Sequence, residues 1–241
     1  SSQSMAVLAL GDGGLVTLDL EGDVIQRMAP ATYGAFRFNN ADIVYNFPLG
    51  TETADLVIVT DGQRDSLRAL AIDPETREII DVTSALIPET LFGLDDGLHT
   101  ANRLAIYPSP RSGTVYAFVT QSAGNLVAQV ELMGDEDGLV SGKVVRLLEL
   151  PVSLSEPENS WATGIVADRF LSHLYVGLPH EPGILRYGAE PNSGSEYVPL
   201  DALAESGRTL DIGGLTSTRL ANPSALRLVT LLWVHYFPTA C

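Results

Sequence analysis

Apolar and polar residues form short alternating runs along this chain, and the clearest example is the segment 54–82. It holds three runs suited to β-strands, separated by Asp-Gly and Asp-Pro-Glu turn signals: Leu56–Val59, Leu67–Ile72 and Glu78–Val82. Short runs bounded by Asp, Gly and Pro are typical of strands joined by tight turns. The segment therefore predicts three consecutive strands of an antiparallel meander.

The same unit recurs through the chain. In each copy an apolar strand is followed by turn residues, an anchoring leucine and a second strand. The anchors are 52, 59 and 59 residues apart: Leu15, Leu67, Leu126 and Leu185. A meander that repeats about every 50 residues favours an all-β propeller, whose blades stack around an axis. A β-sandwich is the alternative, but its strands need not repeat in groups.

Composition and charge limit the partners. The chain has 241 residues, enough for a hydrophobic core, and a formal net charge of −16. That charge disfavours nucleic acid and anionic membrane surfaces, and it fits either simple solubility or cation binding. The one cysteine, Cys241, leaves no internal disulfide. No apolar run reaches the roughly 18 residues of a membrane span, and no signal peptide is visible.

The most specific motif lies in the segment 37–49, which reads RFNNADIVYNFPL. An Asn-Asn-x-Asp stretch leading into a strand that ends in Tyr-Asn-Phe-Pro-Leu resembles the β-propeller phytases, a secreted bacterial family of calcium-dependent phosphatases. Further segments resemble this family in the same order, from about residue 8 to residue 215: 14–22, 71–74, 115–120 and 138–146. The resemblance implies a six-bladed domain, of which this chain holds about four blades.

The resemblance also implies a chemistry. Phytate carries many phosphates, and in this family several Ca²⁺ ions held by carboxylates neutralise that charge, activate water and clamp phosphate oxygens. Lys, Arg and Tyr side chains hold the other phosphates. A calcium cofactor, phytate or another phosphorylated small molecule as substrate, and a secreted or periplasmic location are therefore expected by resemblance.

Position by position, however, this sequence departs from that pattern. Residues that the family uses for phosphate or calcium are replaced as follows: a lysine by Gly11, an arginine by Gly62, a tyrosine by Asn102, a lysine by Ser122, and glutamates by Thr163 and Gly213. Every replacement removes a charge or a phenol. The sequence thus predicts a degenerate site.

Five residues remain as candidates. The expected substrate-binding residues are Asn39, Asn40 and Arg64, the last standing two places after the lost arginine; the expected calcium ligands are Asp42 and Asp211. The alternative is that the asparagines cap a turn and that Asp42 is merely solvated. No catalytic residue is predicted.

Other chemistries find little support. The acidic segments 135–138 and 95–97 lack the spacing of an EF-hand and are expected to be solvated turns. The four histidines show no metal-site spacing, and no Gly-x-Ser-x-Gly elbow supports a nucleophilic triad.

The C-terminal tail breaks the pattern. No Asp or Glu follows Asp211, and the segment 226–237 reads LRLVTLLWVHYF. We expect an incomplete propeller over residues 1–215 and a divergent, irregular tail over 216–241. The tail is either the product of a frame change or truncation in the gene, or a segment that covers an open end of the propeller.

The expected function follows from these observations. The chain is predicted to be a phytase-like propeller domain with weak or no activity alone, serving as an accessory N-terminal domain beside a complete downstream propeller. One alternative is an active calcium-dependent phytase or phosphomonoesterase. Another is a non-catalytic propeller that binds proteins, because a fold does not fix a function.

Overall fold

The computed structural model describes residues 4–29, 36–93, 96–151, 162–179 and 183–200, together with the backbone of two strands at 215–219 and 226–230. Every regular element in these ranges is a β-strand. No helix capable of crossing a membrane occurs in the described part of the chain.

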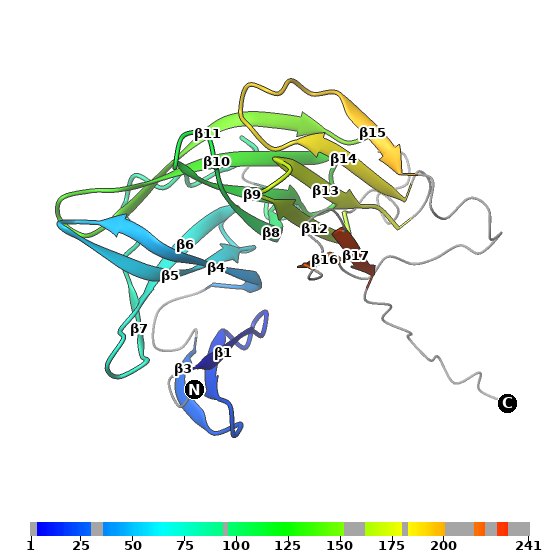
Figure 1. The fold of residues 1–241 in the computed structure, drawn as a ribbon. Coiled ribbons are helices and arrows are strands. Elements are labelled where there is room, and N and C mark those ends of the chain that lie inside the picture. Colours follow the sequence, from blue (N-terminus) through cyan, green and yellow to red (C-terminus); the bar gives the residue numbers. More distant parts are fainter. Residues whose placement is uncertain are drawn as a thin grey trace, which may run out of the picture.

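The strands form antiparallel meanders, one after another (Figure 1). The first sheet has three strands: β1 (Met5–Ala9), β2 (Leu15–Asp19) and β3 (Val24–Met28). The second has four: β4 (Phe38–Leu49), β5 (Glu52–Asp61), β6 (Ser66–Ile72) and β7 (Ile79–Asp81). The third also has four: β8 (Ala101–Pro108), β9 (Val115–Gln121), β10 (Leu126–Gly134) and β11 (Val140–Glu149). The fourth has β12 (Gly164–Asp168), β13 (His173–Gly177), β14 (Ile184–Gly188) and β15 (Tyr197–Leu200). A hairpin follows, β16 (Leu215–Arg219) with β17 (Leu226–Thr230).

These sheets are the blades of an incomplete β-propeller. The first strands of successive sheets are neighbours, since β4 contacts β8, β8 contacts β12 and β12 contacts β16. Blades arranged in this way place their first strands around a common axis. The described blades do not close into a ring (Figure 1). The propeller predicted from the sequence is confirmed.

The anchoring leucines occupy equivalent places. Leu67, Leu126 and Leu185 lie in the third strands of their blades, β6, β10 and β14, whereas Leu15 lies in β2. The first described sheet therefore corresponds to the second, third and fourth strands of the other blades. Its innermost described strand, β1, is the counterpart of β5, β9 and β13.

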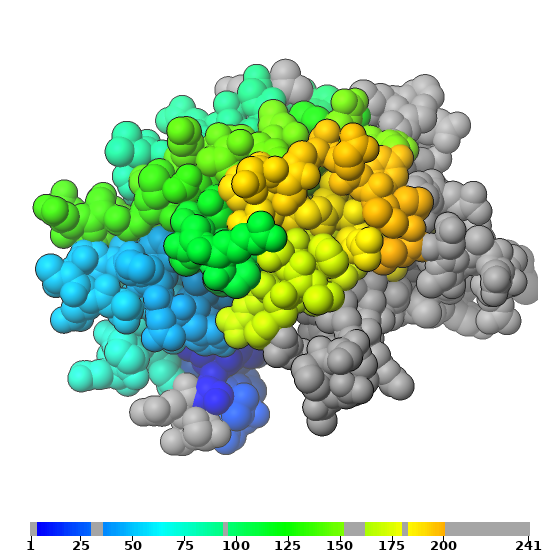
Figure 2. All heavy atoms as spheres, turned by 45° about the horizontal axis from the view of Figure 1, so that its top comes forward, coloured from blue at the N-terminus to red at the C-terminus, as the bar shows by residue number. Residues whose placement is uncertain are grey.

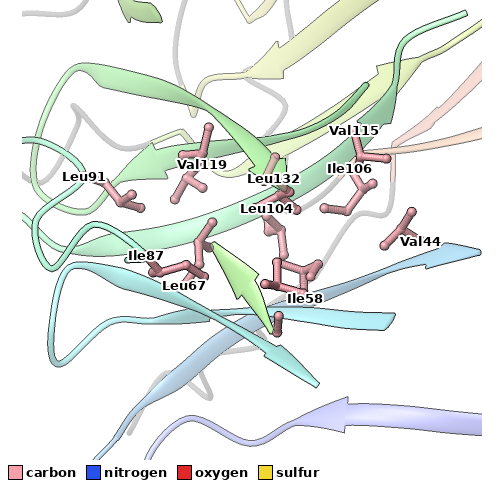
Figure 3. Packing of buried hydrophobic residues seen from close by; sticks show 14 of the residues in the cluster. Val44, Ile58, Leu67, Ile87, Leu91, Leu104, Ile106, Val115, Val119 and Leu132 are labelled. Carbon is pink, nitrogen blue, oxygen red and sulfur yellow. The ribbon is translucent and has the colours of Figure 1, made fainter. Parts of the chain in front are cut away.

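The hydrophobic core lies between blades, because neighbouring sheets pack face to face. All seven residues of β9 are buried, including Thr120 and Gln121. Ile58 and Leu67 of the second blade pack with Leu104 and Val119 of the third in the largest cluster (Figure 3). Burying one such side chain contributes about 2 kcal/mol, so these clusters hold the blades together.

A second cluster joins the third and fourth blades, and it includes Phe118, Leu148, Leu174 and Leu185. Figure 2 shows these two blades, in green and in yellow to orange, in direct contact on the outer surface. A third cluster, which includes Leu15, Phe38 and Val57, joins the first blade to the second.

The tail is partly described. The expected boundary between residues 215 and 216 falls inside β16, which contacts β12 where a fifth blade would begin and pairs with β17. Residues beyond 230 lie outside the described part of the chain.

Candidate functional site

The site expected from the sequence lies at one end of the propeller axis, where the first strand of each blade begins. Strand pairing brings the start of each first strand beside the end of the second strand: Phe38 pairs with Asp61, Ala101 with Gln121, and Gly164 with Gly177. The positions singled out in the sequence therefore gather at this end. We call it the channel mouth, and define it by Asn39, Asn40, Gly62, Asn102 and Thr163.

A cavity of about 550 Å³ extends from the mouth along the first strands β4, β8 and β12. Asn40, Asp42, Arg103 and Thr163 line its mouth end, while Arg169 lies just after the far end of β12. At roughly 3.3 Å per residue, the six steps from Thr163 to Arg169 span roughly 20 Å. The cavity is thus an axial channel rather than a compact pocket.

Asn39 ties two blades together at the mouth. Its side-chain Nδ2 donates a hydrogen bond of 2.9 Å to the backbone carbonyl of Ala101. A Cβ atom on Gly62 would lie 2.2 Å from that Nδ2 and 3.1 Å from the Ala101 carbonyl oxygen. Asn39 therefore fills the space that a side chain at position 62, such as the arginine implied by the resemblance, would need.

Asn40 takes part in a second link between the blades. Its backbone N–H donates to the hydroxyl of Thr60 at 3.0 Å, and that hydroxyl is 2.9 Å from the carbonyl oxygen of Asn102. Thr60 is completely buried. The asparagine pair thus lies where the sequence placed it, with Asn39 bound to backbone and Asn40 lining the cavity.

Asp42 forms the third link. Its Oδ2 accepts a hydrogen bond of 2.8 Å from the backbone N–H of Ile106 in the next blade, and its Oδ1 accepts one of 2.8 Å from Ile43. Burial raises the pKa of the Asp42 carboxyl, although the two backbone hydrogen bonds oppose the shift. Both carboxylate oxygens are therefore engaged in holding β4 against β8.

The described residues do not fit a calcium site at this position. Calcium in proteins takes six to eight oxygen ligands, with several carboxylates among them. Within the described ranges, Asp42 is the one acidic residue that lines the cavity, and no group of three His, Cys, Asp or Glu side chains there could hold a metal ion. The other expected ligand, Asp211, lies outside the described residues.

Arg64 is not brought together with the other candidates. It is exposed in the turn between β5 and β6, and it lines a different cavity of about 680 Å³. That cavity also contains Arg68, whose guanidinium bridges Asp61 at 3.3 Å and Asp81 at 3.1 Å. Arg64 therefore does not line the channel beside Asn40 and Asp42.

The remaining replaced positions make backbone contacts. Gly11 has a left-handed backbone, with φ of +58°, and exchanges hydrogen bonds with Phe38. The N–H of Ser122 donates to the Thr100 carbonyl at 2.7 Å. The Thr163 hydroxyl donates to the Gly177 carbonyl at 3.3 Å. These positions supply neither a cation nor a carboxylate.

Sequence reasoning missed two charged residues of the channel, Arg103 and Arg169. Arg103 follows Asn102 at the start of β8, lines the cavity, and has a buried Nε atom without a hydrogen-bond partner in the described structure. Burial lowers the pKa of its guanidinium. An arginine among the apolar residues of a first strand was the signal that could have revealed it.

Comparison with known proteins agrees with this architecture. The phytase family model matches residues 1–224. The chain is 29% identical over 205 residues to a 3-phytase of Bacillus subtilis (strain 168), a match covering 84% of this chain and 48% of that protein.

Among solved structures, Sqt1 of Saccharomyces cerevisiae superposes with a TM-score of 0.55 at 10% identity, covering 96% of this chain and 54% of Sqt1, a likeness of fold alone. The chain thus spans about half the length of these two proteins. From the family match and the propeller with its Asn-Asn-x-Asp strand, we conclude that this chain belongs to the phytase family.

Proposed function

We propose that this chain is a phytase-like propeller domain with little or no phytate hydrolysis of its own, which serves as an accessory domain of a longer phytase. One observation supports this above all. At the channel mouth, Asn39 and Asp42 are bound to backbone groups of the next blade, and the Thr163 hydroxyl is bound to the Gly177 carbonyl of its own blade.

The chemistry explains why this matters. Attack of water on a phosphate of a polyanion requires positive charge where negative charge develops in the transition state. Removing one such electrostatic stabiliser costs about 3–4 kcal/mol of activation free energy, or a factor of several hundred in rate. The losses need not add, but the replacement of several stabilisers leaves little acceleration.

The accessory role rests on length and family. The chain spans about half of its curated phytase relative. A domain that keeps the blade packing without the charged ligands can still contact a complete propeller. The partners proposed are therefore a downstream propeller of the same family and phytate, in a secreted or periplasmic protein.

Phosphate release from phytate tests the proposal. The purified chain is incubated with phytate at millimolar calcium, with and without excess EDTA, beside a complete phytase at equal molar concentration. We expect release by this chain to stay near the uncatalysed background in both conditions, whereas the complete enzyme responds to calcium. Release that depends on calcium and reaches an ordinary enzymatic rate would show that the site is active and the proposal wrong.

A mixing experiment tests the accessory role. The complete phytase is assayed with and without an excess of this chain, with bovine serum albumin as the control protein. The proposal expects the chain to change the rate or the apparent affinity for phytate, while albumin has no effect. No change on adding the chain, either free or fused ahead of the complete propeller, would contradict an accessory role.

A further inference from the structure

We propose that the axial channel binds a small oxyanion, a phosphate group free or carried on a small molecule, through Arg103 and without a metal ion. This inference does not depend on hydrolysis, and it concerns a residue for which the family resemblance implies no role.

The first argument is the state of Arg103. Its Nε atom is buried and makes no hydrogen bond to any described residue. No carboxylate within the described ranges forms an ion pair with it; the described pairs of other arginines are Arg37–Asp12, Arg68–Asp61, Arg68–Asp81 and Arg111–Glu190. A partly buried guanidinium without a counter-ion is costly, so such a group usually has an anionic partner.

The second argument is the local charge. The protein has 30 acidic and 14 basic residues, yet the described residues of the channel lining include two arginines, Arg103 and Arg169, and one acid, Asp42. The carboxylate of Asp42 is directed to the N–H groups of Ile43 and Ile106. The described part of the lining therefore carries more positive than negative groups in a protein of net negative charge, which favours an anion there.

The third argument is the arrangement of donors. Arg103 and Asn40 come from the starts of the first strands of two neighbouring blades and line the same cavity. Thr163 lines it from the fourth blade, but its hydroxyl donates to the Gly177 carbonyl. The backbone N–H of Arg103 is held by the Thr120 hydroxyl at 3.0 Å, which fixes the base of the side chain. A guanidinium presents several N–H groups in a planar fork that matches the oxygens of a phosphate. The Asn40 amide can add a donor from the facing blade.

Arg169 provides a matched control. It lines the far end of the same channel, and its guanidinium lies 4.7 Å from the centre of the Phe170 ring. Replacing either arginine with glutamine changes the net charge of the channel by the same amount. Only Arg103 lies at the mouth end of the lining with Asn40, so only its replacement should weaken oxyanion binding strongly.

The test is a calorimetric titration with inorganic phosphate, and separately with phytate, in EDTA so that no metal contributes. We expect the wild-type chain to bind phosphate at one site and Arg103→Gln to bind at least about tenfold more weakly, since hydrogen bonds to charged groups contribute about 1.5–3 kcal/mol. Arg169→Gln should change the affinity less than threefold. Tighter binding of phytate than of phosphate would identify a carried phosphate group as the preferred ligand.

Melting temperatures distinguish a variant that has lost phosphate binding from one that has failed to fold. Phosphate should raise the melting temperature of the wild type and of Arg169→Gln but not of Arg103→Gln, and Arg103→Lys should retain part of the shift because it keeps the charge. Absence of phosphate binding by the wild type, or equal weakening by the two glutamine variants, would overturn the proposal. Neither calorimetry nor melting measures phytate hydrolysis. The oxyanion proposal can therefore fail while the domain is inactive, or hold while the domain is an active enzyme.

Discussion

The two ends of the blades use polar side chains in different ways. At the end opposite the mouth, and outside the cavity lining, Glu190 of the fourth blade is 5% exposed, and its carboxylate accepts hydrogen bonds from Tyr107 at 2.7 Å and from Ser109 at 2.9 Å. At the mouth, Asn39 and Asp42 bind backbone groups of the next blade, while Arg103 keeps a buried nitrogen without a described partner. The Glu190 group is therefore a structural network, whereas the mouth also holds an arginine whose Nε has no described partner.

This difference separates stabilisation from ligand binding. Hydrogen bonds that join neighbouring blades are present at both ends, as a propeller requires to hold its sheets in place. The channel lining adds positive charge suited to an anion, from Arg103 and Arg169. The comparison therefore predicts large stability effects for the Glu190 network and smaller, partner-dependent effects at the mouth.

The largest effect is expected for Glu190→Ala. The change leaves the buried hydroxyls of Tyr107 and Ser109 without their acceptor, and each such orphan costs about 1–3 kcal/mol. We expect urea unfolding to show a loss of about 3 kcal/mol in the free energy of unfolding. Glu196→Ala, at an exposed position nearby in the chain, is the control and should change it by less than about 0.5 kcal/mol. Equal small losses for both variants would show that the Glu190 network stabilises nothing.

A smaller effect is expected for Gly62→Ala. The new Cβ would meet the Asn39 amide, so the variant should lose about 2 kcal/mol of unfolding free energy. In the background of Asn39→Ala the same change should cost less than half as much, because the obstructing amide is gone. A double-mutant cycle measured by urea unfolding gives this coupling. Additive losses would mean that Asn39 does not occupy the space of a side chain at position 62.

Asp42→Asn tests the link between β4 and β8. Asparagine has one side-chain oxygen, so its N–H₂ group must face one of the two backbone N–H groups from which Asp42 accepts hydrogen bonds. About 1–2 kcal/mol of unfolding free energy should therefore be lost. Burial raises the pKa of Asp42 above its ordinary 3.8, so between that value and its native pKa the folded state binds more protons than the unfolded state. Stability from this group is therefore highest below its ordinary pKa and falls as the pH rises.

The asparagine variant lacks this dependence. The difference in unfolding free energy between wild type and Asp42→Asn should consequently narrow as the pH is raised from about 4 to 7. Urea titrations at a series of pH values measure it. A difference that widens with pH would mean that a positive charge, rather than burial, dominates the surroundings of this carboxylate.

The blades could be predicted from the sequence, whereas the roles of the site residues could not. Runs separated by turns and recurring leucines are local patterns, and they gave the strands of the second blade within a few residues. The partner of Asn39 is 62 residues away and that of Asp42 is 64 residues away, and only the packing of one blade on the next brings them together.

Arg64 illustrates the same limit. It was expected near the lost arginine because it stands two places further along the chain, but a turn between strands can direct such a residue away from the axis. Arg64 lines the cavity beside Arg68 instead. Arg103, in contrast, lies on a first strand, and its position along the channel depends on the packing of three blades.

The smallest expected effect gives the most direct test of the central claim, that Asp42 holds blades together instead of holding calcium. The melting temperatures of wild type and Asp42→Asn are measured in EDTA and in millimolar calcium. We predict the same calcium-dependent shift in both proteins, because the carboxylate oxygens of Asp42 are engaged by Ile43 and Ile106. A saturable rise in the melting temperature of the wild type that disappears in Asp42→Asn would contradict the account.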